Sequence, residues 1–208
     1  MGSLQKNVQK KGKLYVISGP SGVGKGTICA EMLKDYSTEF SVSMTTRAPR
    51  EGEVDGREYF FVTREEFEAN IESGNFLEHA EVFGNMYGTP KDAVLRRLER
   101  GRNVLLDIDV QGGLQVKSIM PEAVMIFLLP PNLDILKERL IGRKTEAPEI
   151  VERRLSKAAN EIKFIGEYDY YIVNDDLDTA VAEARSIMQA ESLRVPEKVK
   201  SIISQYAE

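Results

Sequence analysis

Residues 14–27, LYVISGPSGVGKGT, decide the fold of this chain of 208 residues. The apolar run 14–17 predicts a short strand, and the pattern Gly-x-x-x-x-Gly-Lys follows it at 19–25. A helical pattern then runs from about Gly26 to about Lys34. In this order of strand, glycine-rich loop and helix, successive backbone N–H groups turn inward around phosphate oxygens, and the start of the helix adds its dipole. We therefore expect a loop that binds the phosphates of a nucleotide.

The loop combines backbone donors with one cation. Lys25 is expected to place its positive charge against the β and γ phosphates. Where the general pattern has Ser or Thr to hold Mg2+, this chain has Gly26 and then Thr27, so either Thr27 or a water molecule could reach the metal. The residues predicted to bind the nucleotide here are Ser18, Gly19, Pro20, Ser21, Gly22, Val23, Gly24, Lys25, Gly26 and Thr27.

Three further apolar runs predict the rest of a buried sheet. They are VLLDI at 104–108, VMIFLL at 124–129 and YYIV at 170–173. Continuous apolar runs that alternate with helical segments are typical of parallel strands buried on both faces. The predicted fold class is α/β, with a doubly wound P-loop core in which helices flank a parallel sheet.

Two segments do not follow this alternation of apolar strands and helices. Residues 41–98 hold short strand-like pieces and turn glycines, which indicate a small inserted subdomain. Residues 133–165 have the pattern of a charged helical pair without a broad apolar stripe, which favours an exposed lid over a part of the core. The expected organisation is a flexible arm at 1–12, a domain at 13–192 whose core comprises 13–40, 99–132 and 166–192, and a C-terminal helix or tail at 193–208.

A second candidate site lies in the inserted segment, in SVSMTTRAPREGEVDGREYFFV at 41–62. Arg47 and Arg50 are three residues apart, beside several hydroxyl groups and near Tyr59. Two guanidinium groups give forked donors that suit a phosphate dianion. Two arginines alone are more often ordinary surface residues of a solvated loop.

This segment resembles the guanylate kinase signature, and FLEHAEVFGNMYGTP at 76–90, LLDIDVQG at 105–112 and GRKTE at 142–146 continue the resemblance. The form Gly-Lys-Gly-Thr also resembles nucleoside monophosphate kinases. The resemblance extends from about residue 13 to about residue 190 and implies a GMP-binding function for the insert. It implies that the GMP phosphate is bound by Arg47, Arg50, Tyr59 and Tyr87, that guanine is read by Ser43, Glu78, Thr89 and Asp109, and that Asp107 lies near Mg2+ through water.

Hydrogen-bond chemistry supports the guanine assignment. Guanine offers two adjacent donors, its N1–H and 2-amino groups, and a carboxylate such as that of Glu78 accepts from both. Adenine has an acceptor at N1, which would face the carboxylate lone pair against lone pair. Without this context, Glu78 would be interpreted as a surface acid on an amphipathic helix, and its neighbour His79 as a structural or surface residue.

The predicted lid holds the arginines that would complete the reaction. The resemblance implies that Arg143 and Arg154 close on the transferring phosphoryl group and act with Lys25 and Arg47, while Arg139 contacts ATP. It also implies an adenine-side loop at Asn174 and Asp175. The expected mechanism is direct in-line transfer of the γ-phosphoryl group from ATP to GMP, without a covalent enzyme intermediate. For Arg139 and Arg153, a salt-bridged exposed helix is an equally good interpretation.

Composition limits the other functions. The net charge of −5 argues against a nucleic-acid surface, and no apolar run is long enough for a membrane span. Cys29 is the single cysteine, which favours a reducing, cytoplasmic location. The expected partners are the small molecules ATP and GMP, while the oligomeric state stays open because the apolar positions after 193 suit either a partner helix or a tail.

Two other functions compete with this interpretation. Guanylate-kinase-like domains of scaffold proteins bind phosphorylated partners without catalysis, but they generally have a degraded phosphate loop, whereas GPSGVGK is intact here. A kinase for another nucleotide or small molecule is the second alternative. The set Ser43, Glu78, Thr89 and Asp109 argues against it, and a panel of nucleotide acceptors distinguishes the two.

Overall fold

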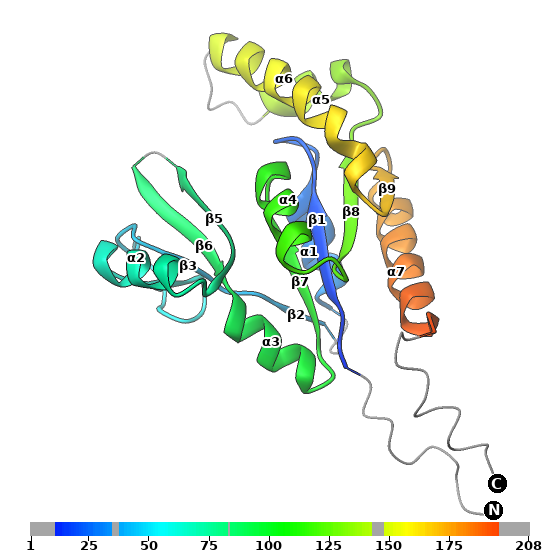
Figure 1. The fold of residues 1–208 in the computed structure, drawn as a ribbon. Coiled ribbons are helices and arrows are strands. Elements are labelled where there is room, and N and C mark those ends of the chain that lie inside the picture. The colour runs from blue at the N-terminus through cyan, green and yellow to red at the C-terminus, as the bar shows by residue number, and fades with distance from the viewer. Residues whose placement is uncertain (1–10, 35–37, 83, 143–147, 196–208) are drawn as a thin grey trace, which may run out of the picture.

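A five-stranded parallel sheet forms the centre of the molecule (Figure 1). The structure is a computed structural model, and it describes residues 11–34, 38–82, 84–142 and 148–195. The order β2-β7-β1-β8-β9 places the strand that precedes the glycine-rich loop in the middle of the sheet. The strands are β1 (Leu14–Ser18), β2 (Thr38–Phe40), β7 (Asn103–Asp107), β8 (Val124–Leu129) and β9 (Tyr170–Val173).

The prediction of an α/β fold with parallel strands is confirmed, and all four apolar runs are strands of this sheet. Strand β2, which pairs in parallel with β7, was not predicted. Side chains of β1 alternate between the two faces of the sheet. Tyr15 and Ile17 pack in one buried cluster, and Leu14 and Val16 pack in another. Both faces are therefore covered, as a continuous apolar run requires.

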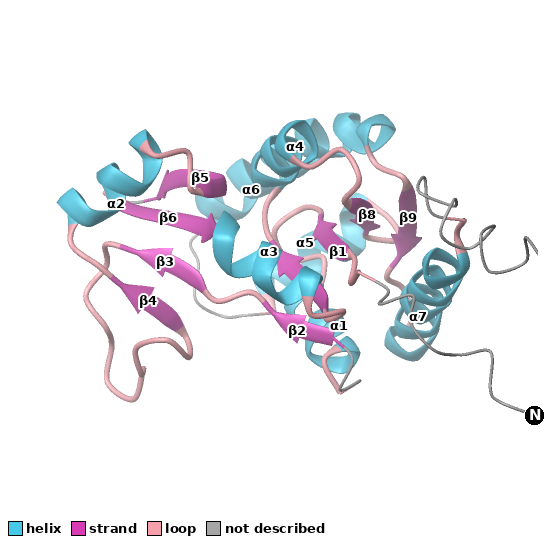
Figure 2. Ribbon diagram, turned by 60° about the horizontal axis from the view of Figure 1, so that its bottom comes forward, coloured by secondary structure: helices cyan, strands magenta, loops and turns pink. Residues whose placement is uncertain are grey.

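Helices supply the two outer layers (Figure 2). The cluster on one face includes side chains of α1 (Lys25–Met32) and α7 (Leu177–Leu193), and the cluster on the other includes side chains of α3 (Lys91–Glu99) and α4 (Val110–Ile119). Helix α3, which the sequence places in the insert, thus packs Val94 and Leu98 onto the core.

The last turn of α7 contains a buried carboxylate, Glu191, which accepts hydrogen bonds from Lys13 at 2.6 Å and Tyr170 at 2.7 Å.

The insert is a second sheet of four strands, in the order β4-β3-β6-β5. Strands β3 and β4 pair in parallel, and the other pairs are antiparallel. The capping box of Thr63 and Glu66 begins α2, whose Phe67 stacks on Phe76 at a ring distance of 4.5 Å. The sequence predicted the strand-like pieces at β3 and β4 but not the β5–β6 hairpin. The elements are β3 (Ser43–Thr45), β4 (Tyr59–Phe61), α2 (Arg64–Glu72), β5 (Phe76–Val82) and β6 (Asn85–Pro90).

The predicted helical pair is present as α5 (Leu133–Ile141) and α6 (Pro148–Ile162), followed by a short 3-10 helix, η1 (Lys163–Glu167). Figure 1 shows it at the end of the sheet where β1 leads into the loop. The sequence predicted a pair without a broad apolar stripe, and the buried apolar contacts within the pair come from a few side chains. Leu136 and Leu140 of α5 pack against Val151 and Ala158 of α6, so the pair has a small core of its own. In the described part of the chain, no helix is long and apolar enough to cross a membrane.

Candidate active site

The glycine-rich loop connects the buried end of β1 to the start of α1. Gly24, the residue before the helix, has a φ of 99°, in the left-handed region that side chains other than glycine rarely adopt. Lys25 turns back across the loop and donates hydrogen bonds from Nζ to the carbonyl oxygens of Gly19 at 2.7 Å and Pro20 at 3.3 Å. Burial lowers the pKa of Lys25, and the nearby carboxylate of Asp107 opposes this shift. The loop therefore holds a poorly solvated ammonium group at its centre.

Asn174, just after β9, supports this loop from the neighbouring element. Its side-chain Nδ2 donates to the carbonyl oxygen of Val23 at 2.7 Å, and Asn174 is itself buried. A Cβ on Gly24 would clash with the same nitrogen. The backbone oxygen of Asn174 accepts a hydrogen bond from Arg139 of α5 at 2.9 Å. The amide of Asn174 thus contacts the loop itself, and Asp175 beside it is exposed.

Helix α5 also packs directly on the loop. A Cβ on Gly22, where φ is 90°, would lie 2.8 Å from a methyl carbon of Leu140. On α6, Arg154 Nη1 lies 3.5 Å from the hydroxyl of Ser21, a loop residue. Arg153 is exposed, and Arg143 lies outside the described residues. Of the predicted lid arginines, the structure therefore brings Arg154 to the loop and Arg139 to Asn174, which supports the loop.

Two aspartates lie at the carboxyl end of β7, one as its last residue and one just after it. Asp107 is the last residue of β7, and its Oδ2 would be 3.6 Å from a Cβ on Gly26. Burial raises the pKa of Asp107, while Lys25 acts in the opposite direction. Asp109 caps α4, because its side chain accepts a hydrogen bond from the Gly112 N–H at 2.9 Å. Thr27, the other predicted metal residue, is exposed on α1.

The insert brings Arg47 together with aromatic rings and an acid. Arg47 Nη2 donates to both carboxylate oxygens of Glu53 at 2.9 Å, and its guanidinium carbon lies 5.5 Å from the centre of the Tyr59 ring. The Arg50 N–H donates to Glu53 at 2.8 Å. These bonds lower the pKa of Glu53, with the bond from Arg47 as the largest cause. The sequence analysis missed Glu53, although the acid stands three residues after Arg50.

Tyr87 and Ser43 complete this part of the insert. The rings of Tyr59 and Tyr87 meet edge to face at 5.9 Å. Ser43 is the first residue of β3 and is the register partner of Tyr59 on β4. Three residues that were predicted to bind GMP therefore lie together with Arg47 around one sheet surface, namely Ser43, Tyr59 and Tyr87.

Glu78 and Thr89 form a buried polar pair. They are register partners on β5 and β6, and the Thr89 hydroxyl donates to Glu78 Oε1 at 2.6 Å. Burial raises the pKa of Glu78; the hydrogen bond from Thr89 opposes this shift, and Asp109 adds to it. A Cβ on Gly112 would be 3.2 Å from Glu78 Oε2, so the absence of a side chain there lets α4 approach the carboxylate. The interpretation of Glu78 as a surface acid on a helix is wrong.

The fold and this site define a class. The parallel α/β sheet has a glycine-rich, lysine-bearing loop at its centre. An arginine of the helical pair lies beside this loop, and a second sheet carries a cluster of arginine and tyrosine side chains. This combination is typical of a P-loop nucleotide kinase.

Comparisons with known proteins identify the family. The guanylate kinase family model matches residues 11–191. The chain is 51% identical over 200 residues to the guanylate kinase of Clostridioides difficile strain 630, covering 96% of this chain and 98% of that protein. It is 51% identical over 190 residues to that of Streptococcus agalactiae serotype III, covering 90% and 91%. The crystal structure of guanylate kinase from Anaplasma phagocytophilum superposes with a TM-score of 0.69 at 36% identity, over 89% of this chain and 88% of that one.

The chain belongs to the guanylate kinase family, and it is an enzyme with guanylate kinase function.

Proposed function

We propose that this enzyme transfers the γ-phosphoryl group of ATP directly to the phosphate of GMP, and that the buried pair of Glu78 and Thr89 selects guanine. The observation that carries the proposal is the burial of the Glu78 carboxylate, which among the described residues accepts a side-chain hydrogen bond from Thr89. Burial disfavours the charged form, so a ligand that offers two N–H donors stabilises it. Guanine has such a pair in its N1–H and 2-amino groups, whereas adenine presents an acceptor at N1. Ser43 and Asp109 would contribute further contacts to the base.

The phosphate of GMP would bind at Arg47, Arg50, Tyr59 and Tyr87. Glu53 already holds the guanidinium of Arg47 in one orientation, with both carboxylate oxygens at 2.9 Å. Because a guanidinium group has five N–H donors in a fixed fork, Arg47 keeps donors for a phosphate while it is bonded to Glu53. We infer that the insert binds GMP through a preformed set of donors.

ATP would occupy the loop between Gly19 and Thr27. Lys25 would exchange its carbonyl contacts for the β and γ phosphates, since an ammonium group held in a poorly solvated site gains from a strong anion. Arg154, together with Arg143 and Arg139, would neutralise the charge that develops on the transferred group. Closure of the helical pair over the loop would exclude water, the competing acceptor. Asp175 and Asn174 would border the adenine.

The donor set suits Mg2+ that arrives with ATP. Mg2+ usually keeps several water ligands and takes one or two protein oxygens plus substrate phosphates. Asp107 and Thr27 offer one carboxylate and one hydroxyl near the start of α1, and the described residues contain no cluster of three or more acidic, histidine or cysteine ligands. When bound, Mg2+ neutralises charge on the β and γ phosphates.

The cytoplasmic location and the division into core, GMP-binding insert and lid stay predictions, and the oligomeric state is open.

The variant Glu78→Gln tests the guanine assignment, because it keeps the shape of the side chain and replaces one acceptor with a donor. We expect kcat/KM for GMP to fall about 100-fold and the preference for GMP over AMP to shrink by a similar factor. The matched control is Glu81→Gln, which changes an acid on the same strand whose side chain is 53% exposed. An unchanged preference for GMP in Glu78→Gln would refute the role given to this carboxylate.

A further inference from the structure

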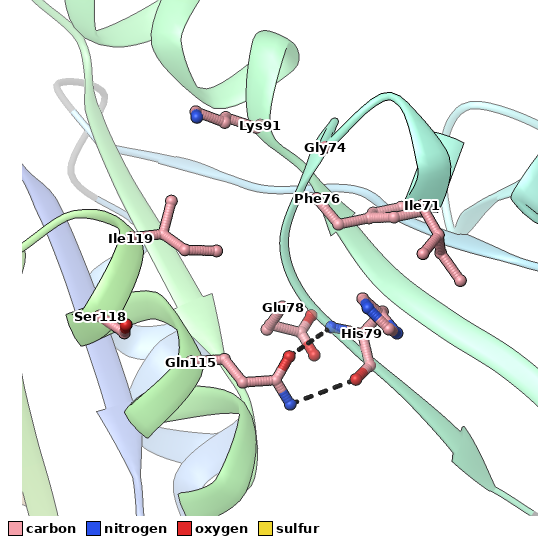
Figure 3. Close-up of a pocket in the computed structure, with 9 residues that line it drawn as sticks. All are labelled: Ile71, Gly74, Phe76, Glu78, His79, Lys91, Gln115, Ser118 and Ile119. Atoms are coloured by element: carbon pink, nitrogen blue, oxygen red, sulfur yellow. Dashed lines mark hydrogen bonds between the residues drawn. The ribbon is translucent and has the colours of Figure 1, made fainter. Parts of the chain in front are cut away.

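The outer edge of β5 is bonded to a side chain of the core. Strand β5 is at the end of the four-stranded sheet, so within the described parts of the chain its outer backbone groups have no neighbouring strand. At His79, the side chain of Gln115 on α4 forms the hydrogen bonds that a neighbouring strand would form. The His79 N–H donates to Gln115 Oε1 at 3.1 Å, and Gln115 Nε2 donates to the His79 carbonyl oxygen at 3.3 Å (Figure 3). A glutamine amide has an acceptor and a donor side by side, as have the N–H and C=O of one residue along the edge of an extended strand, and it therefore substitutes for the missing strand.

This contact lies next to the proposed guanine-reading carboxylate. His79 follows Glu78 in the chain, and both belong to β5. Gly112, one helical turn before Gln115, is the residue that lets α4 approach Glu78. Helix α4 therefore meets β5 twice on one face, once at the carboxylate of Glu78 and once at the backbone of the following residue.

Side-chain packing leaves a gap at this position. A groove of about 440 Å³ separates the two elements beside the amide, lined by Ile71 and Phe76 on the insert and by Ser118 and Ile119 on α4. Figure 3 shows the amide of Gln115 reaching to His79 at the border of this groove. Leu77 of β5 and Val116 of α4 pack in one buried cluster, and at the groove beside that cluster the two hydrogen bonds of Gln115 fix the backbone of β5 relative to α4.

We propose that Gln115 is a positioning residue for guanine recognition, which fixes the backbone of β5 so that Glu78 faces the start of α4 and Asp109. The proposal rests on the proposed function of Glu78. Gln115 acts through the strand and does not itself contact the nucleotide. Its loss weakens GMP binding and base selection and leaves ATP binding unchanged.

The test compares GMP with IMP, which lacks the 2-amino group that Glu78 would accept from. In Gln115→Ala we expect KM for GMP to rise about tenfold, as loss of two neutral hydrogen bonds allows, with kcat and KM for ATP within about twofold of the parent. The ratio of kcat/KM for GMP to that for IMP falls by about fivefold or more, because a displaced carboxylate discriminates less. Ser118→Ala is the matched control, since Ser118 lines the same groove from the same helix and is exposed.

A second variant and a double-mutant cycle keep the test decisive. Gln115→Glu preserves shape and one acceptor but places an oxygen against the His79 carbonyl, so it raises KM for GMP even if Gln115→Ala folds poorly. In a Glu78→Gln background, Gln115→Ala no longer changes the ratio of GMP to IMP, since the residue acts through Glu78. An unchanged ratio in folded Gln115→Ala, or an equal rise in KM for ATP, overturns the proposal. If Glu78→Gln alone leaves the ratio unchanged, the guanine assignment itself is wrong.

Discussion

Replacement of Asn174 tests whether the ATP loop depends on a side chain that lies outside it. The Nδ2 atom of Asn174 donates to the carbonyl oxygen of Val23 at 2.7 Å in a buried position. Asn174→Ala leaves that carbonyl without this donor, and an unsatisfied buried acceptor costs about 1–3 kcal/mol. That range corresponds to about a 5- to 150-fold change in an equilibrium constant, and we expect about a tenfold weaker binding of ATP.

Asn174→Asp should be the more damaging change. It replaces the donating nitrogen with an oxygen that would face the Val23 carbonyl, and it adds a negative charge beside the site of a triphosphate. We expect ATP binding to weaken by about a further factor of ten relative to Asn174→Ala. The binding of GMP should stay within about twofold of the parent, because GMP binds at the insert.

Calorimetric titration of each variant with a non-hydrolysable ATP analogue and with GMP measures both effects. Gln189→Ala is a suitable control, since it removes an exposed amide from α7. The reasoning is refuted if Asn174→Ala binds the ATP analogue as tightly as the parent, or if Asn174→Asp is no weaker than Asn174→Ala.

Three further predictions follow from other parts of the structure. Glu191→Gln should lower the free energy of unfolding by about 2 kcal/mol at neutral pH, measured with urea. Burial raises the pKa of Glu191, but its hydrogen bonds outweigh this and lower the pKa overall. The stabilisation by the carboxylate is therefore present above the ordinary glutamate pKa of about 4.3 and is lost as the pH falls below that value. An equal difference in unfolding free energy between parent and variant at neutral and at acid pH would contradict this. Arg47→Lys should raise KM for GMP about tenfold or more and leave KM for ATP unchanged, because lysine lacks the guanidinium fork that bonds twice to a carboxylate or phosphate. Steady-state kinetics measure both constants, with Arg57→Lys, at an exposed arginine of the insert, as the control. Equal changes in the two variants would disprove this prediction. Gly24→Ala should abolish most ATP binding and lower the melting temperature, whereas Gly74→Ala, at a similarly positive φ but with open space around it, should cost only about 1 kcal/mol; equal effects in thermal unfolding would show that the contact at Gly24 is unimportant.

The central sheet could be predicted because the sequence pattern that indicates each of its longer strands is local. Each of the four apolar runs is continuous and ends at turn residues, and continuous burial on both faces leaves little choice other than parallel strands. Strand β2 has only three residues, Thr38, Glu39 and Phe40, which is too short for a periodic pattern. Strand β5 was missed although it is longer, because Glu78 and Glu81 interrupt its apolar residues and suit a helix equally well.

The candidate site was predicted in part for the same reason. Contiguous motifs predicted the loop and singled out Arg47 and Arg50, whereas the lid arginines and the pair of Glu78 and Thr89 came from the resemblance. The contacts that position these groups join distant residues. The bond from Asn174 to Val23 spans 151 residues, and the bonds between Gln115 and His79 span 36. Local propensity and spacing carry no information on such pairs, since only the folded topology brings them together.

The most direct test of the whole account is the rate of ADP formation from MgATP with GMP, dGMP, AMP, UMP and CMP as separate acceptors. We predict that kcat/KM for GMP exceeds that for AMP by about 100-fold or more. We also predict that Lys25→Ala lowers the rate with GMP by about 100-fold or more while the protein stays folded. Folded parent protein that turns over no acceptor, or that phosphorylates AMP as well as GMP, would contradict the account.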